Sequence, residues 1–367
     1  MTIQAQLPAP VIFGEWIMHQ REFALVCVTS TDGLRGYAYT LTRDGAVAEQ
    51  IRKTIARVYV GTEVGTQEQT FTVAWRRSLA SHAAGIGLRA LSIVDLACWD
   101  LAAKSMDRSI AAMLGGANRP MPATAIIGYP PAIMGPEETG TQTAELYAAG
   151  WRRFKAPVAA TPDRTAGRLR AARAAAPDAW LGLDAAWVFD DVDEAAAFVN
   201  SVADVGLGWF EDVFPPGDAD QLRRLRERTT TPIAMGDEQG GIYYPEALIA
   251  REAVDVVRLD LTCMGGISRG RRIINQVLDA GLTFAPHMFG HVHSQVLAAL
   301  GYTDAPIEWG IPFTGVHPMD DPLTQPTIGA DGRMAAMEEA PGFGYLVDPD
   351  WVRSQPHEDP DGILGGL

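Results

Sequence analysis

Hydrophobic and polar positions in the first 120 residues follow a strand period and then a helix period. From about residue 23, the stretch FALVCVTSTDGLRGYAYT contains two apolar runs joined by Asp32-Gly33, a dipeptide typical of a β-hairpin turn. The later stretch GIGLRALSIVDLACWDLAAKSM places its apolar residues at a helical spacing. It is followed by SIAAMLGG, in which Gly115-Gly116 is expected to end a helix. The pattern predicts an α+β region.

After Pro120, short apolar runs alternate with helical stretches rich in Ala, Arg, Glu and Leu. The runs lie at residues 123–129, 152–158, 179–185, 208–213, 232–237, 255–261, 283–288 and 306–310. Strand, helix and strand at this spacing predict parallel pairing through right-handed crossovers, and eight such units close into a (β/α) barrel. A doubly wound open sheet is the alternative, but no Gly-x-Gly-x-x-Gly motif follows the first run.

Composition narrows the choice of partners. The 367 residues are 47% hydrophobic and 20% charged, as in an ordinary globular protein, and the formal net charge is −15. This charge argues against nucleic acids and anionic membranes as partners, because both need a basic face. An anionic substrate would need a local cation, such as a divalent metal ion.

Cysteine usage and the N-terminus carry no sign of secretion. Cys27, Cys98 and Cys263 are odd in number and far apart, so they are expected to be buried reduced thiols rather than a disulfide or zinc framework. The N-terminal residues lack a signal-peptide pattern, and no apolar run is long enough to span a membrane. The expected location is the cytoplasm.

Seven successive strand runs each carry one ionisable residue near the C-terminal end. These residues are Lys155, Asp184, Glu211, Asp237, Asp260, His287 and Glu308. They are about one strand–helix unit apart, so a barrel would bring all of them to the same rim. This rim is where the active sites of such barrels lie.

Three of these rim residues, Asp184, Glu211 and Asp237, are carboxylates on adjacent strands. Their mutual repulsion would raise their pKa values unless a cation binds, and ligation by oxygens alone suits Mg²⁺ better than Mn²⁺. Adjacent residues on a strand point to opposite sides, so Glu211 is preferred to Asp212 and Asp237 to Glu238, with the second choice left open. Alternatively, these carboxylates face helices or loops and form salt bridges.

His287 and Asp260 end neighbouring runs, so the carboxylate is expected to hold one imidazole nitrogen and make the other a base. His291 and His293 lie beyond the strand, in a loop or an early helix turn, where each would be solvated or contact the substrate. A zinc site formed by the three histidines is the weaker reading, because it leaves the three carboxylates unexplained.

The remaining rim residues have candidate roles at the substrate. Lys155 would bind a substrate carboxylate and stabilise enolate charge, or reach solvent at the rim. Glu308 would donate to an enolate oxygen if protonated, bind substrate hydroxyls, or make structural hydrogen bonds. Arg258 lies on the same side of its strand as Asp260 but deeper, so it is expected to be a buried partner of carboxylates or, less readily, a substrate contact.

This set of residues resembles the enolase superfamily and, within it, the mandelate racemase subgroup, over nearly the whole chain. The segments TDGLRGYAYT and LSIVDLACWDLAAKSMDRSIAAMLGG are similar to the hairpin and long helix of the family's capping domain. The segments GLDAAW, WFEDVFPP and PIAMGDE resemble its three metal-ligand strands. VRLDLTCMGGISRG and FAPHMFGH resemble the Asp–His base dyad, IEW the glutamate of the last strand, and PGFGY the C-terminal segment.

The resemblance implies an architecture and a chemistry. Residues 1–120 would form an α+β capping domain, residues 121–325 a modified (β/α)₇β barrel, and residues 326–367 a segment that packs on the capping domain. One Mg²⁺ per subunit would bind the substrate carboxylate and stabilise the enediolate that forms when a base removes the α-proton, a known strategy of this superfamily. A homo-oligomer and a small carboxylate substrate are also implied.

Two departures from the racemase pattern change the expected reaction. That pattern ends strand two with Lys-x-Lys, whose second lysine is a base opposite the histidine, whereas this chain has Lys155-Ala156-Pro157. In addition, Ala186 replaces a common asparagine near the metal. A base on one face suits elimination, which favours a dehydratase that converts an acid sugar or similar α-hydroxy acid to a 2-keto-3-deoxy acid. A racemase or epimerase with another base, such as a tyrosine or loop histidine, and a non-catalytic binding barrel are the alternatives.

Overall fold

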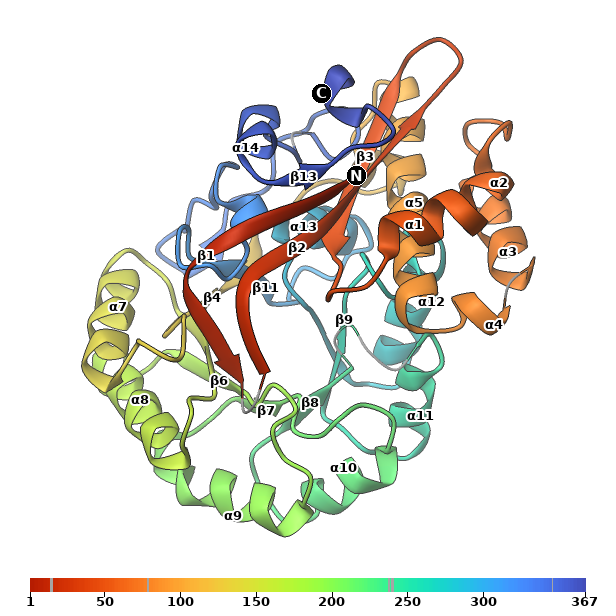
Figure 1. Ribbon diagram of the computed structural model, residues 1–367. Coiled ribbons are helices and arrows are strands. Elements are labelled where there is room, and N and C mark those ends of the chain that lie inside the picture. The colour runs from red at the N-terminus through yellow and green to blue at the C-terminus, as the bar shows by residue number, and fades with distance from the viewer. Residues whose placement is uncertain (14–15, 78, 237, 239–240, 345) are drawn as a thin grey trace.

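The computed structural model describes residues 1–13, 16–77, 79–236, 238, 241–344 and 346–367. Within these residues the strands form a four-stranded antiparallel sheet and a mostly parallel barrel sheet (Figure 1). Each of the eight predicted runs overlaps one barrel strand, which confirms the predicted barrel. The doubly wound alternative is wrong, because the strands pair in chain order and the last pairs with the first.

The antiparallel sheet has the order β13-β1-β2-β3 and forms most of the cap. Its main strands are β1 (Thr2–Phe13), β2 (Trp16–Thr29) and β3 (Arg35–Leu41). The predicted hairpin between β2 and β3 is confirmed, and Gly33 supplies the positive φ of 93° that its turn requires. The sequence pattern did not reveal β1.

Helices complete the cap. They are α1 (Val47–Gln50), a π-helical turn (Ile51–Ile55), α2 (Ala56–Tyr59), α3 (Gln67–Arg77), α4 (Leu79–His82), α5 (Gly85–Ser105) and α6 (Ile110–Met113). The long predicted helix corresponds to α5, which is buried along most of its length against β3 and the barrel. Gly115, with a φ of 87°, follows α6 and ends it as expected.

The barrel consists of strands that alternate with helices on its outer surface. The strands are β4 (Met121–Ile126), β5 (Arg153–Pro157), β6 (Trp180–Asp184), β7 (Trp209–Glu211), β8 (Ile233–Met235), β9 (Val256–Leu259), β10 (Thr283–Pro286) and β11 (Ile307–Gly310). The helices are α7 (Pro136–Ala148), α8 (Pro162–Ala175), α9 (Val192–Ser201), α10 (Ala219–Arg226), α11 (Tyr244–Ala250), α12 (Gly266–Asp279) and α13 (Gly290–Ala299). This is the (β/α)₇β arrangement that the resemblance implied.

Local sequence determines where several barrel helices begin. The side chains of Thr161, Asp191 and Asp218 precede α8, α9 and α10 and accept hydrogen bonds from backbone N–H groups of the first turn. Such caps satisfy donors that have no partner inside the helix. They fix the residue at which each outer helix begins, after the loop that follows its strand.

The C-terminal segment returns to both sheets. Its short strand β12 (Arg333–Met334) pairs with β4, and β13 (His357–Glu358), after α14 (Pro349–Ser354), pairs with β1 at Thr2 and Ile3. This second pairing holds His357 and Glu358, near the C-terminal end of the sequence, on the cap sheet. The exact domain boundaries stay a prediction.

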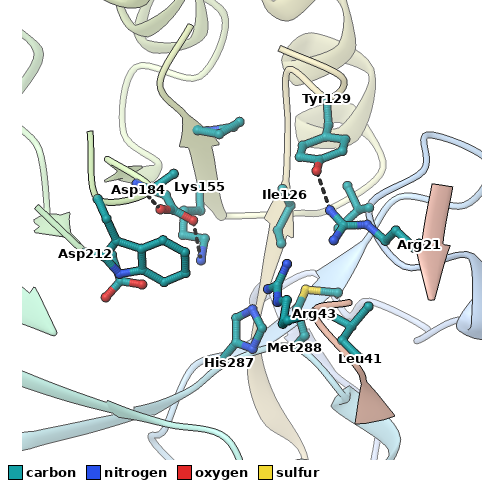
Figure 2. Close-up of a pocket in the computed structure, with 14 residues that line it drawn as sticks. Arg21, Leu41, Arg43, Ile126, Tyr129, Lys155, Asp184, Asp212, His287 and Met288 are labelled. Atoms are coloured by element: carbon teal, nitrogen blue, oxygen red, sulfur yellow. Dashed lines mark hydrogen bonds and ion pairs between the residues drawn. The ribbon is translucent and has the colours of Figure 1, made fainter. Parts of the chain in front are cut away.

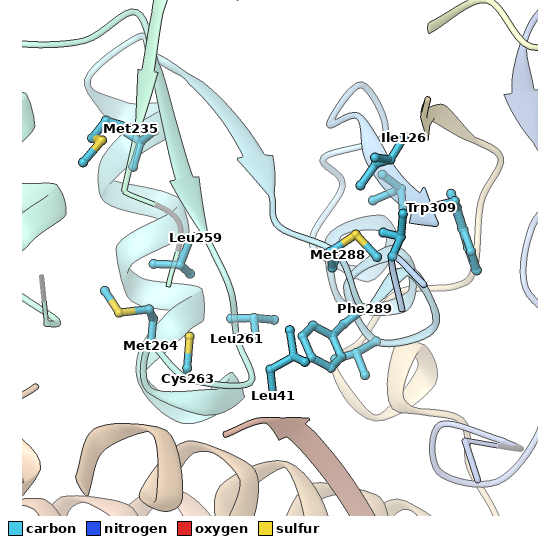
Figure 3. Close-up of a cluster of buried hydrophobic side chains, with 14 of the residues drawn as sticks. Leu41, Ile126, Met235, Leu259, Leu261, Cys263, Met264, Met288, Phe289 and Trp309 are labelled. Carbon is cyan, nitrogen blue, oxygen red and sulfur yellow. The ribbon is translucent and has the colours of Figure 1, made fainter. Parts of the chain in front are cut away.

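The cap and barrel share one hydrophobic core. Leu41 of β3 lies in the same buried cluster as Leu261, beyond β9, and Phe289, before α13 (Figure 3). The ring of Phe289 also packs against Tyr39 of β3, with centroids 5.6 Å apart. In the part of the chain that the structure describes, no helix has the length and apolarity needed to cross a bilayer. The cytoplasmic location and the homo-oligomeric state stay predictions.

Candidate active site

A pocket lies at the C-terminal ends of the barrel strands, beneath the cap (Figure 2). Side chains from β2, from the segment after β3 and from the ends of β4, β5, β6, β7 and β10 converge on it. Its lining residues are Arg21, Leu41, Arg43, Ile126, Tyr129, Lys155, Pro157, Asp184, Ala186, Trp187, Asp212, His287, Met288 and Val316. Lys155, Asp184 and His287 are thus brought together, as the strand-end pattern predicts.

Asp184 and Glu211 form the centre of a carboxylate cluster. They are the last residues of β6 and β7 and are direct neighbours in the parallel register. With Asp212 they offer oxygens that all lie within 4.8 Å of one another. Glu211 is fully buried, and burial raises its pKa to about 8 although Arg258 and Lys155 oppose the shift.

This cluster fits a hard divalent cation. Oε2 of Glu211 is buried without a hydrogen-bond partner in the described structure, so it remains available as a ligand. A bound Mg²⁺ would remove the cost of ionising the buried carboxyl, and oxygen ligands suit that ion. Asp184 and Glu211 are therefore the residues that would hold it, and Asp212 comes close enough to contribute.

The third predicted ligand, Asp237, lies outside the described residues. Its neighbour Glu238 is fully engaged elsewhere: one oxygen accepts from Arg43, whose Nε lies 2.8 Å away, and the other accepts from Arg89. These two arginines outweigh burial and hold the pKa of Glu238 well below its usual range. Both oxygens of Glu238 thus serve the arginines, although Glu238 also has a ligand atom within 4.8 Å of those of Asp260 and Cys263.

Lys155 is 2% exposed and neutralises carboxylates around the pocket. Its Nζ lies 2.8 Å from Glu211, 2.6 Å from Glu308 and 3.5 Å from Asp184. Burial alone would lower the pKa of Lys155, but Glu211 and Glu308 raise it well above its usual range. A permanently charged ammonium at the pocket wall fits the predicted role at a substrate carboxylate, and the alternative of a solvated rim lysine is wrong.

His287 and Asp260 form the expected dyad. They follow β10 and β9, which pair in parallel, and Nδ1 of His287 lies 3.4 Å from Oδ2 of Asp260. Asp260 is fully buried, which would raise its pKa, but its hydrogen bond with His287 and the nearness of His293 lower the pKa. Nδ1 of His287 faces Asp260 and the residue lines the pocket, so the imidazole lies between the buried carboxylate and the space for a ligand.

The solvated-loop expectation for His291 and His293 is wrong. Both are buried in the first turn of α13, which starts directly after the left-handed residues Met288 and Phe289. His291 packs edge-on against Trp309 and is not among the residues that line the pocket, so its contact with a substrate stays a prediction. Nor does any group of candidate metal ligands among the described residues contain the three histidines.

His293 has a structural role that the sequence did not reveal. Its Nδ1 lies 2.6 Å from the carbonyl oxygen of Met288, and its Nε2 accepts from the N–H of Leu261 at 3.0 Å. Burial lowers its pKa, which keeps the ring neutral as this pair of hydrogen bonds requires. His293 therefore connects the segments that carry Asp260 and His287.

Arg258 and Glu308 lie behind the pocket rather than in its wall. Arg258 is fully buried and lies 2.8 Å from Glu308 and 3.1 Å from Glu211, so its expected role as a carboxylate partner fits and that of a substrate contact does not. Despite burial, Arg258 and Lys155 hold the pKa of Glu308 far below its usual range. Glu308 accepts from the N–H of Met288 at 3.2 Å, which fits the expected structural hydrogen bond, and its role at the substrate stays a prediction.

Several pocket residues were not selected from the sequence. Arg21 and Arg43 come from the cap, and Tyr129 and Trp187 follow β4 and β6. Tyr129 carries a recognisable signal, because it ends the first strand run just as Lys155 ends the second. Arg21 has no such signal, since its place in the pocket depends on how the cap docks.

The two departures from the racemase pattern both lie at the pocket. Pro157 is the last residue of β5 and lines the pocket where the second lysine would stand. Ala186 adopts a left-handed φ of 49°, and its N–H donates to Asp184 at 2.9 Å. The side chain of Pro157 therefore supplies no proton acceptor on the β5 side of the pocket.

Comparisons with known proteins match both parts of the chain. The N-terminal domain of the family named mandelate racemase / muconate lactonizing enzyme matches residues 1–115. The family described as enolase C-terminal domain-like matches residues 138–351.

Named relatives align along nearly the full length. The chain is 25% identical over 373 residues to D-galactarolactone cycloisomerase of Agrobacterium fabrum, which covers 98% of this chain and 97% of that protein. It is 25% identical over 342 residues to arabinonate dehydratase of Saccharolobus solfataricus, with 90% and 89% covered. The structure of L-talarate dehydratase from Polaromonas sp. JS666 with Mg and L-glucarate has a TM-score of 0.83 and 20% identity, over 97% of this chain and 95% of that one. At that identity the structural likeness supports the fold alone.

Proposed function

Since the chain belongs to the mandelate racemase / muconate lactonizing enzyme family of the enolase superfamily, we propose that it is a Mg²⁺-dependent dehydratase of acid sugars or similar α-hydroxy acids. The product would be a 2-keto-3-deoxy acid. Relatives named as dehydratases of such acids support this reaction class. The proposal depends above all on one observation, which is that the pocket has a histidine base on one side and a proline where the opposing base would stand.

Different residues would bind the metal ion, bind the substrate carboxylate and remove the α-proton. Asp184 and Glu211 hold Mg²⁺, which when bound supplies positive charge against the charge that develops on the substrate carboxylate. Lys155 places a fixed ammonium beside the same carboxylates and binds the substrate carboxylate. His287, oriented by Asp260, accepts the α-proton at Nε2.

Elimination then completes the reaction. The electron pair of the broken C–H bond forms a double bond to the β-carbon, and the β-hydroxyl leaves with a proton as water. If both groups lie on the same face, protonated His287 can donate that proton. Tautomerisation of the enol gives the 2-keto acid without any second base.

A racemase would need a proton carrier on the other face, and the described pocket offers a poor one. Tyr129 is the tyrosine that lines it, but burial raises its pKa even though Arg21 lies close. A phenol with a raised pKa is ionised less readily to the phenolate that would accept the proton. His291, the loop histidine considered for this role, is buried elsewhere.

Incubation with a panel of acid sugars and Mg²⁺ in D₂O tests the proposal. We expect 2-keto acid to accumulate while the recovered substrate keeps its configuration. Deuterated substrate with inverted configuration, in the absence of 2-keto acid, would establish a racemase instead.

A further inference from the structure

Arg21 is a cap residue that reaches the barrel pocket. It belongs to β2, in the antiparallel sheet, yet it lines the same cavity as Lys155, Asp184 and His287. Figure 2 shows its guanidinium beside Tyr129, on the opposite side of the pocket from Asp184 and Lys155, with His287 between the two sides. The residue is only 7% exposed.

The hydrogen-bond partners of Arg21 among the described residues are uncharged. Nε donates to the carbonyl oxygen of Gly315 at 3.0 Å, and one terminal nitrogen donates to the hydroxyl of Tyr129. The other terminal nitrogen donates to no residue that the structure describes, and no described carboxylate lies within ion-pair distance. By contrast, the neighbouring pocket cations Arg43 and Lys155 are both ion-paired.

A buried cation without a counterion is costly, because water no longer solvates it. Burial accordingly lowers the pKa of Arg21. The chain does bury another arginine among neutral groups: Arg168 donates to Thr139, Pro157 and Gly128. However, all three guanidinium nitrogens of Arg168 donate hydrogen bonds within the protein, and Arg168 does not line the pocket. Arg21 does line the pocket, so its remaining donors can reach a bound ligand.

Since the proposed function puts one substrate carboxylate at the Asp184 side, an extended substrate would place its far end near Arg21. We infer that the substrate is a dicarboxylic acid sugar and that Arg21 binds its second carboxylate. This inference rests on the proposed function and narrows its substrate class to aldaric rather than aldonic acids. A guanidinium is suited to this task because its planar donors match a carboxylate.

Matched substrates test the inference directly. Hexarates and the corresponding hexonates, such as D-glucarate and D-gluconate, differ only in a carboxylate or hydroxymethyl group at C6. For the wild-type enzyme with Mg²⁺, kcat/KM for the best hexarate should exceed that of its matched hexonate by on the order of 100-fold. Arg21→Met should reduce this ratio to below about fivefold, mainly through KM for the diacid, and Arg21→Lys should retain part of it.

Control variants separate charge recognition from folding. Arg168→Met removes a buried arginine that does not line the pocket, so it should keep the diacid preference even if stability falls. Tyr129→Phe keeps the positive charge of Arg21 and should also keep most of the preference. The inference would be overturned if the wild-type enzyme had equal kcat/KM values for matched hexonates and hexarates. It would also be overturned if Arg21→Met kept the wild-type ratio of these two values. Either result would leave the dehydratase proposal intact.

If no acid in the panel yields a 2-keto acid, the proposed function fails, and equilibrium binding then decides the inference. Calorimetry with Mg²⁺-loaded protein should give D-glucarate at least about tenfold tighter binding than D-gluconate, with the difference lost in Arg21→Met. Equal affinities, or no binding of either acid at millimolar concentration, would overturn it.

Discussion

His287 and Glu211 have different proposed roles, so replacing His287 should lower kcat, whereas replacing Glu211 should weaken Mg²⁺ binding. His287→Asn deletes the proposed base while leaving the carboxylate cluster intact, and kcat should fall at least about 1000-fold with Mg²⁺ affinity within about threefold of wild type. Glu211→Gln removes a ligand with a free, buried oxygen and should weaken Mg²⁺ binding by on the order of 100-fold. Calorimetric titration with Mg²⁺ alone checks both variants, and loss of metal binding in His287→Asn would make that histidine a ligand.

His293 should matter for catalysis without touching the substrate. Its two ring nitrogens connect the backbone beside Asp260 with the backbone beside His287. His293→Leu leaves the carbonyl of Met288 and the N–H of Leu261 unpaired, so the dyad should lose its alignment and kcat should fall about 10- to 100-fold with little change in KM. His293→Asn, which can restore the bond to Met288, should recover part of kcat; equal losses in both variants would argue for a purely structural role.

Sequence reasoning found residues whose position follows from strand period alone. Lys155, Asp184, Glu211, Asp260 and His287 meet at one rim because parallel strands of similar length end together. Side chains whose environment depends on their neighbours were harder to predict. Glu308 lies in buried ion pairs that the strand period does not reveal. His291 and His293 were expected to be solvated or to contact the substrate, but both are buried. The sequence has no side-chain cap that marks the start of α13, because the helix begins after the left-handed turn at Met288-Phe289.

At the scale of elements, β3 and α5 make an unusually close contact at Gly36. A Cβ there would lie 2.2 Å from the carbonyl oxygen of Ala97 and 2.6 Å from the N of Leu101. Because these are backbone atoms of a buried helix, they have little room to move, so Gly36→Ala should lower the free energy of unfolding by about 1–3 kcal/mol or more. Gly365→Ala, where a Cβ meets open space, is the matched control for denaturant unfolding; equal stability of the two variants would contradict the contact.

The junction of α5 and α12 should make stability depend on pH. Asp95 of α5 is fully buried against Ser268 of α12, and burial raises its pKa to about 7 from an ordinary value of 3.8. Between about pH 4 and pH 7 the folded state keeps a proton that the unfolded state releases. The free energy of unfolding should therefore fall as pH rises through this window, by up to a few kcal/mol.

Asp95→Asn isolates this contribution. Asparagine cannot ionise but can still accept from the N–H of Ser268, so the variant should lose the pH-dependent component between pH 4 and pH 7. Urea unfolding at a series of pH values measures it. An unchanged pH profile in Asp95→Asn would mean that Asp95 keeps an ordinary pKa in the folded protein.

For the whole molecule, the barrel could be predicted more fully than the cap. Each barrel strand is a short apolar run and its pairing follows chain order, so local patterns carry the topology. In the cap, Pro8 and Pro10 interrupt the alternation of β1, and its pairing with β2 shifts register between Gln6 and Val11. Its outer partner β13 comes from the far end of the chain, which no local pattern can indicate.

The contact between cap and barrel includes a buried ionic group, which gives a prediction for the molecule as a whole. Glu238 follows β8 of the barrel, whereas its partners Arg43 and Arg89 belong to the cap. Glu238→Gln would leave both guanidinium groups without their counterion in a buried setting. Removing one member of such a network typically costs about 3–5 kcal/mol, so the variant should unfold at a clearly lower denaturant concentration.

The same variant distinguishes the two readings of the third metal ligand. If both oxygens of Glu238 serve the arginines, as their hydrogen bonds indicate, Glu238→Gln should reduce stability while Mg²⁺ affinity stays within about threefold of wild type. Asp237→Asn should do the reverse, because a ligand contributes to the free protein's stability far less than to metal binding. Mg²⁺ titration of both variants decides the assignment: a collapse of affinity in Glu238→Gln alone would make Glu238 the ligand and require its arginine contacts to open when the ion binds.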